Sequence, residues 1–236
     1  MSTATRVDLL RRGEAAGGRR LRGAATDDPL SPRGRADMER VLAGADGWDA
    51  IVTSPMQRCH AFAQAAAAAL DLPLGVDARL VEYDFGAWSG RELDALWADA
   101  GDALAAFFAD PDARTPPGGE AAPDFRARVR AAWADLLARH AGTHVLVVGH
   151  GGVLRQLVTD TLGATRPMHH ALAWPNAALS RLEVFEDPEY GRSTRPGVPR
   201  AGVLTPFASG GRSCMQICRP AAAIAACPER ALRANG

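Results

Sequence analysis

The stretch "THVLVVGHGG" (residues 143–152) is the strongest structural signal in this chain. Its apolar run leads directly into a turn rich in glycine. Continuous apolar runs of this kind are typical of central strands in a parallel sheet, which are buried on both faces. Ligands of open α/β sheets bind beyond the carboxyl ends of such strands. We therefore expect His150, which lies between two glycines, on the ligand side of the sheet.

Strands and helices alternate along the rest of the chain. Further strands are predicted at "RVDLL" (6–10), "WDAIVTSP" (48–55) and "ALSRLEVF" (178–185), the last nearer a sheet edge. Helices are predicted at 31–45, 57–72, 91–110, 124–142 and 153–163. This alternation predicts an α/β sheet with helices on both faces. Residues 83–124 read as a helical insertion that contains the loop "DPDARTPPGGE".

The composition changes near residue 187. Residues 188–236 are rich in proline, glycine, serine and arginine, which predicts a poorly packed C-terminal tail. A short alanine-rich helix near 220–226 is the one element expected there. Residues 1–187 are predicted to form a single domain.

Composition and charge exclude several classes of function. The 236 residues carry no formal net charge, so no global electrostatic case exists for binding nucleic acid or an acidic membrane. All 27 basic residues are arginine, which excludes lysine chemistry. No secretory signal or membrane-length apolar segment is evident, so we expect a cytoplasmic protein with reduced thiols. We expect no zinc site at the cysteines, which are Cys59, Cys214, Cys218 and Cys227.

Three of the predicted strands end next to cationic groups. The first strand ends at Arg11 and Arg12, the second is followed by Arg58, and the third by His150. If these strands are neighbours, their side chains converge at one edge of the sheet. Guanidinium groups and helix N-termini bind phosphate oxygens well. The sequence therefore predicts a site for a dianionic group, with phosphate as the best fit.

The order of these motifs resembles the histidine phosphatase superfamily, in the branch with phosphoglycerate mutases and α-ribazole phosphatases. "DLLRRGE" is similar to the family's leading Arg-His-Gly motif, "TSPMQRC" to its Ser-Pro-x-x-Arg segment, and "VEYDFGAWSG" to its glutamate segment. "PPGGE" with "DFRARV" is similar to another recurring stretch, and "VLVVGHGGVLRQLV" to the second histidine motif. The resemblance covers residues 6–187 and looks closest to the α-ribazole phosphatase group. It implies a three-layer α/β/α sandwich with a mostly parallel central sheet, as in phosphoglycerate mutases.

The resemblance also implies a role for each matching residue. Arg11, Arg58 and His150 would hold the phosphoryl oxygens. Glu82 would protonate the leaving group and later activate water, for which it needs partial burial. Because arginines and histidine neutralise the phosphate, no metal and no other cofactor is expected. The residues that match the phosphate loop are Gly13, Ser54 and Gly151.

The family's nucleophilic histidine is replaced by Arg12 in this sequence. A neutral imidazole offers a nitrogen lone pair, whereas a guanidinium stays charged and only donates hydrogen bonds. Two-step transfer through a phosphohistidine should therefore fail, while binding need not be lost. Direct attack by water with Glu82 as base is a weaker hypothesis, because nothing marks a partner that would position the water. Arg12 is compatible with an engineered substitution, a natural pseudo-phosphatase and an error in the sequence.

The sequence as a whole predicts a phosphomonoester hydrolase for a small phosphorylated metabolite such as α-ribazole 5′-phosphate, with turnover impaired by Arg12. The alternatives are a phosphate-ester-binding pseudo-phosphatase and a phosphoglycerate mutase. The small-molecule phosphomonoester is the predicted partner, and both a monomer and a homodimer stay open. Aromatic residues of the insertion either wall the substrate's alcohol part or belong to the core; they are Trp88, Trp97, Phe107 and Phe108.

Overall fold

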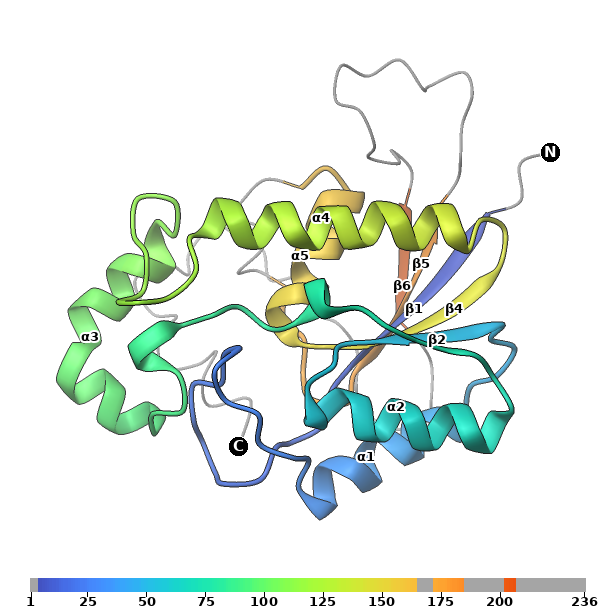
Figure 1. Ribbon diagram of the computed structural model, residues 1–236, viewed down its shortest axis with the longest axis horizontal. Coiled ribbons are helices and arrows are strands. Elements are labelled where there is room, and N and C mark those ends of the chain that lie inside the picture. Colours follow the sequence, from blue (N-terminus) through green and yellow to red (C-terminus); the bar gives the residue numbers. More distant parts are fainter. Residues whose placement is uncertain (1–3, 165–171, 185–201, 207–236) are drawn as a thin grey trace.

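The computed structural model describes residues 4–164, 172–184 and 202–206 of the chain. Its centre is a six-stranded sheet in the order β3-β2-β4-β1-β5-β6 (Figure 1). The strands are β1 (Thr5–Arg11), β2 (Ala50–Thr53), β3 (Leu74–Val76), β4 (His144–Gly149), β5 (Leu179–Val184) and β6 (Gly202–Pro206). All four strands predicted from the sequence are confirmed.

The sheet is mostly parallel, as predicted. Strands β1, β4, β2 and β3 run parallel to one another, whereas β5 pairs antiparallel with β1 and β6 antiparallel with β5. The two outermost strands, β3 and β6, were not predicted. Strand β3 has three residues, which is too short for an alternating pattern to identify. Strand β5 lies nearer an edge than β1 and β4, as predicted, with β6 outside it.

The five predicted helices are confirmed with small shifts at their ends. Ser31 caps the first of them: its hydroxyl accepts a hydrogen bond from the Gly34 backbone N–H at 2.9 Å, and a proline follows at the first helical position. The helices are α1 (Pro32–Leu42), α2 (Gln57–Leu70), α3 (Leu93–Ala109), α4 (Ala122–Arg139) and α5 (Gly151–Thr161). Two short 3-10 turns, η1 (Ala78–Leu80) and η2 (Gly86–Trp88), precede α3.

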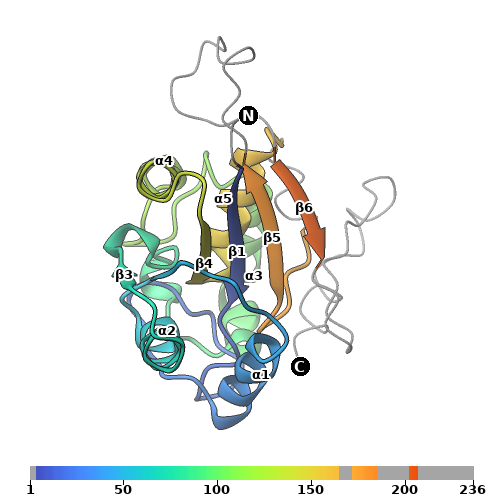
Figure 2. The same ribbon diagram turned by 90° about the vertical axis from the view of Figure 1, so that its right-hand side faces the viewer.

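Each face of the sheet has its own hydrophobic core. Val145 and Val147 of β4 point to the face that α3, α4 and α5 cover, where they join Leu154. Leu146 and Val148 point to the opposite face, which α1 and α2 cover. Figure 1 shows α4 and α2 on opposite sides of the strands, and Figure 2 shows β4, β1, β5 and β6 side by side. The predicted three-layer α/β/α fold is confirmed.

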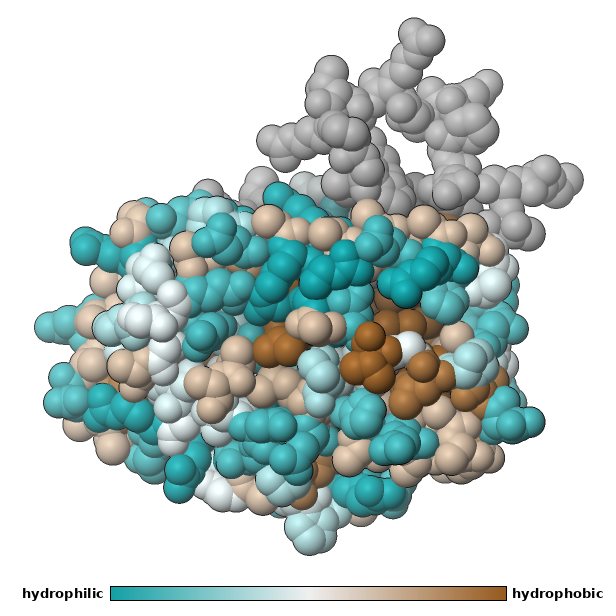
Figure 3. Space-filling view, viewed as in Figure 1, coloured by the Kyte–Doolittle hydropathy of each residue, from teal (hydrophilic) through white to brown (hydrophobic). Residues whose placement is uncertain are grey.

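The insertion between β3 and β4 carries α3 to the far end of the molecule (Figure 1). Helix α3 is kinked at Ala100, whose φ of −132° is not helical. The predicted loop at 110–120 joins α3 to α4. On the surface, strongly hydrophilic residues gather over α4, and apolar residues lie in a band between α4 and α2 (Figure 3).

The C-terminal segment contains one described element. Strand β6 extends the sheet with residues 202–206, within the segment predicted to be poorly packed. The predicted helix near 220–226 and the cysteines at 214, 218 and 227 lie outside the described residues. The division into a domain at 1–187 and a tail at 188–236 stays a prediction.

Candidate active site

The structure brings the predicted strand ends together. Strand β4 lies between β1 and β2, and all three run parallel, so their carboxyl ends meet at one edge. Arg11 pairs in register with Gly149, and the Arg12 backbone N–H donates to the Gly149 carbonyl at 2.9 Å. On the other side of β4, the Ser54 N–H donates to the Val148 carbonyl at 3.4 Å. The convergence expected from the sequence is confirmed at the level of the strands.

Arg11 points its guanidinium toward the first turn of α5. One terminal nitrogen donates to the Trp174 carbonyl, but Nε is buried and has no hydrogen-bond partner. A Cβ on Gly151 would lie 3.1 Å from that Nε and 3.2 Å from a terminal nitrogen of Arg155. Gly151 therefore leaves room for two guanidinium groups. Burial, and then the charge of Arg12, lower the pKa of Arg11 to about 9, so it is still protonated at neutral pH.

Arg58 lies in the first turn of α2 and is fully buried. Its terminal nitrogens donate to the Thr26 carbonyl and, at 3.2 Å, to the Gly23 carbonyl. Its Nε has no partner among the described residues. Burial lowers the pKa of this group below its ordinary value. Arg11 and Arg58 thus share one property, a buried guanidinium with an unused donor.

His150 caps the N-terminal end of α5 and is fully buried. Its Nε2 lies 2.9 Å from the Ser54 hydroxyl, and both ring nitrogens lie within 3.7 Å of the Cys59 sulfur. Burial, followed by the charges of Arg58 and Arg12, holds the pKa of His150 well below its ordinary value. The imidazole is therefore neutral at neutral pH.

Glu82 is partly buried, as its expected role requires, and its carboxylate lies at the start of α5. One oxygen accepts from the Gly152 N–H at 3.1 Å, and the other accepts from the Tyr83 N–H at 3.0 Å. A Cβ on Gly152 would lie 2.5 Å from Glu82 Oε1, so the glycine makes room for the carboxylate. A negative charge at a helix N-terminus is stabilised by the helix dipole.

Arg12 lies in the same cluster of charges. Its guanidinium donates to the Gly13 carbonyl at 2.9 Å. Burial, and next the charge of Arg58, lower the pKa of Arg12 to about 10. At neutral pH roughly one molecule in 10³ would then carry a neutral guanidine, so Arg12 acts as a cation. The structure thus places a third charged guanidinium, Arg12, beside Arg11 and Arg58.

Cys59 carries a thiol that contacts this cluster. It follows Arg58 in the first turn of α2 and is fully buried. Its sulfur lies 3.6 Å from Nε2 of His150. Burial raises the pKa of the thiol to about 12, although the charges of Arg58 and Arg12 act in the opposite direction. The thiolate is the reactive form of cysteine. At neutral pH the Cys59 thiol is therefore protonated and not in its nucleophilic form.

Arg155 also belongs to this cluster, although the sequence did not predict it. It follows Gly151 by four residues, so both lie on one face of α5. Its Nε donates to the Leu172 carbonyl at 2.8 Å, and burial lowers its pKa. The spacing of four residues between Gly151 and Arg155 was the sequence signal that could have identified this arginine. The charges of Arg11 and Arg155 interact with each other, and both interact with Glu82.

The structure also shows what surrounds the site. A Cβ on Gly13 would overlap the Gly34 backbone, so close packing against α1 requires a glycine here, and its role in a phosphate loop stays a prediction. Trp88 and Phe107 belong to the core, with ring centroids 5.8 Å apart. Of the remaining aromatic residues, Trp97 packs against that core and Phe108 is 37% exposed.

Neither a metal-binding cluster nor a membrane-crossing segment is found in the part of the chain that the structure describes. No group of three histidine, cysteine, aspartate or glutamate side chains there could hold a metal ion. No helix among those residues has the length and apolar character needed to span a bilayer.

Comparison with known proteins identifies the family. The sequence profile of the histidine phosphatase superfamily (branch 1) matches residues 7–191. The chain belongs to the histidine phosphatase superfamily. A bifunctional protein of Mycobacterium tuberculosis is 34% identical over 189 residues, which cover 78% of this chain and 52% of that protein. The chain thus spans about half the length of the first curated relatives that it matches.

Further known proteins are similar to this chain over most of their length. The probable phosphoglycerate mutase GpmB of Klebsiella pneumoniae is 32% identical over 187 residues, 77% of this chain and 86% of GpmB. A mycobacterial glucosyl-3-phosphoglycerate phosphatase superposes with a TM-score of 0.71 at 26% identity, covering 86% and 98% of the two chains. The α-ribazole phosphatase of Shigella flexneri shares the fold, with a TM-score of 0.70 at 22% identity over 86% and 96%.

Proposed function

We propose that this chain binds the phosphate group of a small phosphomonoester at the carboxyl edge of β1, β4 and β2. The observation that carries the proposal is the pair of buried guanidinium groups, Arg11 and Arg58, each with an unpaired Nε donor. A buried polar group without a partner costs about 1–3 kcal/mol, more if it is charged. Phosphate oxygens are suited to accept from such donors, and their charge offsets the repulsion between the arginines.

The surrounding charges support an anionic ligand. Arg12 and Arg155 add two cations to the cluster, and the first turn of α5 adds backbone N–H donors. Known superfamily members that share this fold are named as phosphatases of α-ribazole phosphate and of glucosyl-3-phosphoglycerate. We propose a ligand of the same class, a small phosphorylated metabolite such as α-ribazole 5′-phosphate.

Turnover is the step that Arg12 impairs. In the proposed chemistry Glu82 would protonate the leaving oxygen, and the neutral His150 would contact the phosphoryl group. A charged guanidinium at position 12 has no lone pair with which to attack phosphorus. Because Cys59 is also protonated, its thiol does not supply the covalent nucleophile that position 12 lacks. A phosphoglycerate mutase reaction through a phosphohistidine would require the same missing group.

A phosphate-ester-binding protein without turnover is the second candidate function. The charge on Arg12 favours this candidate, because a fourth guanidinium beside Arg11, Arg58 and Arg155 strengthens anion binding while it removes covalent catalysis. The two candidates differ in what Arg12→His does. In an impaired phosphatase this single change restores hydrolysis, whereas in a dedicated binding protein it changes affinity alone.

The deciding experiment compares the parent chain with Arg12→His on a panel of phosphomonoesters. We expect the parent to hydrolyse them at least about 10³-fold more slowly than the Arg12→His chain. Equal rates in the two chains would overturn the role assigned to position 12. Retained binding with no gain in rate would favour the binding protein.

Binding is measured separately by thermal unfolding with inorganic phosphate. A ligand at 100 times its Kd stabilises the folded state by about 2.7 kcal/mol. We expect Arg58→Ala to abolish the phosphate-induced increase in Tm. The matched control is Arg35→Ala, which removes an exposed arginine that pairs with Glu39 on α1. Phosphate should stabilise the control as it does the parent; no stabilisation of the parent would refute the anion site.

A further inference from the structure

Glu82 lies on a segment that lacks regular structure. It follows the 3-10 turn η1 and precedes η2, so no helix or strand ladder holds its backbone. A catalytic carboxylate acts at a defined distance, and a displacement of about 1 Å can cost about 10²-fold in rate. The contacts that hold residues 79–84 are therefore relevant to the chemistry proposed for Glu82.

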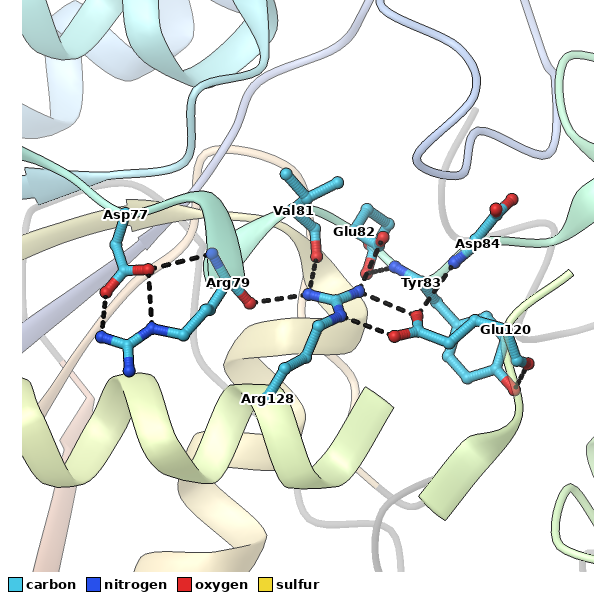
Figure 4. A network of polar contacts seen from close by, with 8 residues as sticks. All are labelled: Asp77, Arg79, Val81, Glu82, Tyr83, Asp84, Glu120 and Arg128. Carbon is cyan, nitrogen blue, oxygen red and sulfur yellow. Dashed lines mark hydrogen bonds and ion pairs between the residues drawn. The ribbon is translucent and has the colours of Figure 1, made fainter. Parts of the chain in front are cut away.

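Arg128 of α4 donates hydrogen bonds to the backbone carbonyl groups of this segment (Figure 4). One terminal nitrogen donates to the carbonyls of Arg79 and Val81, both at 2.6 Å. The other terminal nitrogen donates to the carbonyl of Glu82 itself at 3.1 Å. A single side chain thus binds three carbonyls of the segment, including the backbone of the proposed acid.

Glu120 orients the guanidinium of Arg128 from the opposite side. Its two carboxylate oxygens accept from Nε at 2.6 Å and from a terminal nitrogen at 2.9 Å. Its backbone N–H donates to the Asp84 carbonyl at 2.9 Å, and its carbonyl accepts from the Tyr83 hydroxyl at 2.7 Å. Glu120 therefore fixes the arginine and also tethers the two residues that follow Glu82.

The geometry requires an arginine at this position. Five donors in a planar fork serve three carbonyls and a carboxylate at once, which a lysine ammonium cannot do. The side chains of Arg128 and Glu120 are 22% and 16% exposed, so solvent screens the pair less than a surface pair. Bidentate pairing also restricts the orientation of the guanidinium.

We propose that Arg128 and Glu120 are positioning residues that hold Glu82 for proton transfer. Arg128 holds the backbone carbonyl of Glu82, while the Gly152 N–H holds its carboxylate at the start of α5. The residue is thus anchored at both ends, to α4 and to α5. This inference rests on the proposed function, because the position of Glu82 matters only if Glu82 takes part in phosphoryl transfer.

The chain supplies a matched control pair on the same helix. Arg130, two residues beyond Arg128, binds the Asp160 carboxylate of α5 in the same bidentate way, at 3.0 and 2.7 Å. The structure records no bond from this pair to residues 79–84. A general loss of packing around α4 would therefore follow the loss of either pair, whereas displacement of Glu82 should follow only the loss of Arg128 or Glu120.

The test is an NMR titration that does not depend on turnover. In the full chain labelled with ¹⁵N-glycine, the Gly152 amide proton reports on the carboxylate to which it donates. We expect its signal to shift as acid protonates Glu82, and Glu82→Gln identifies the signal by removing that shift. The neighbouring charges of Arg11, Arg12, Arg58 and Arg155 do not titrate in the acid range.

We expect Arg128→Lys and Glu120→Gln to lose most of the pH-dependent shift of Gly152, while Arg130→Lys and Asp160→Asn retain it. Retention in folded Arg128→Lys or Glu120→Gln would overturn the proposal, as would an equal loss in the controls. If Arg128→Lys fails to fold, Glu120→Gln decides. Inorganic phosphate added to the parent sample tests the anion site independently: failure to bind would refute the proposed function and leave the result on Glu82 standing.

Discussion

The Nε2 atom of His150 lies 2.9 Å from the Ser54 hydroxyl, which joins the start of α5 to the end of β2. The imidazole of His150 is fully buried, and the charges that act on it are those of arginines. Burial and those positive charges keep the folded protein's His150 neutral under conditions in which an unfolded chain would protonate it. This difference between the two states makes the stability of the protein depend on pH.

The first prediction is that the free energy of unfolding decreases as the pH falls below about 6.5, the ordinary histidine pKa. The folded pKa of His150 is depressed, so the unfolded state binds the extra proton and is favoured by acid. One such group contributes at most about 1.4 kcal/mol per pH unit. Urea unfolding at a series of pH values measures the slope, which His150→Asn should reduce.

His140 provides the control for this measurement. Its pKa is also lowered, by burial and by Arg139, but the side chain lies near the surface at the end of α4. His140→Asn should change the slope less than His150→Asn. A slope that is identical in the parent and in His150→Asn would show that His150 is not held neutral by the fold.

The second prediction concerns Gly152→Ala. The new Cβ would lie 2.5 Å from Glu82 Oε1, and the carboxyl end of a flexible side chain is the group that must move. We expect little change in Tm, because alanine is favoured over glycine within a helix. In an Arg12→His chain that turns over, the rate should fall about 10²-fold through loss of general acid catalysis. Steady-state kinetics with a phosphomonoester measures this, and an unchanged rate would contradict the placement of Glu82.

The third prediction concerns Asp8, a fully buried carboxylate on β1. Arg181 donates to both of its oxygens at 2.7 and 2.9 Å, and Trp48 donates at 2.9 Å. Burial raises the pKa of Asp8, but the hydrogen bonds from Arg181, His144 and Trp48 outweigh it and lower the pKa overall. Asp8→Asn should lower the free energy of unfolding by about 3–5 kcal/mol, because it breaks a bidentate ion pair whose carboxylate is fully buried.

The same ion pair predicts a loss of stability in acid. Since the pKa of Asp8 is lower in the folded state, its contribution is complete above the unfolded value of about 3.9 and is lost as the pH falls through the folded value. Chemical unfolding of the parent and Asp8→Asn near pH 7 and pH 3 tests this. The control is Glu183→Gln, which removes an exposed pair with Arg6 on the same two strands and should cost at most about 1 kcal/mol.

The fourth prediction is that Cys59 resists alkylation in the folded chain. Its pKa of about 12 leaves almost no thiolate at pH 8, and the sulfur is fully buried. Peptide mapping after iodoacetamide treatment should find Cys59 unmodified in native protein and modified in denaturant. Any residual phosphatase activity of the parent should survive Cys59→Ala. Its disappearance in a folded variant would identify the thiol as a substitute nucleophile.

Much of the fold could be predicted because its signals are local. The apolar run "VLVV" before Gly149 indicates a strand by itself. Ser31 and Pro32 likewise indicate the start of α1 without help from the rest of the chain. Strand β3 could not be predicted, because three residues bear no periodicity and gain their strand geometry from pairing with β2. Strand β6 likewise depends on β5, since little in a proline- and glycine-rich segment favours a strand by itself.

The sequence could predict which residues form the candidate site, but not how deeply each one is buried or which groups it contacts. The motifs identified Arg11, Arg58, Glu82 and His150 as one set, and the strand order places their backbones at one edge. The motifs did not indicate that His150 is fully buried against Ser54, or that Gly13 is required by packing. Both depend on side chains that arrive from other segments of the chain.

By itself, the sequence determined four strands, five helices and the family, because periodicity, capping and residue identity act over a few neighbouring positions. Only the tertiary structure decided which donors are left unpaired in Arg11 and Arg58, and that Arg155 joins them. It also brought Arg128 and Glu120 to the backbone of Glu82, some 40 residues away in the chain. Burial and hydrogen bonding across such separations arise only when the layers pack, which is why the chemistry of the site follows from the fold.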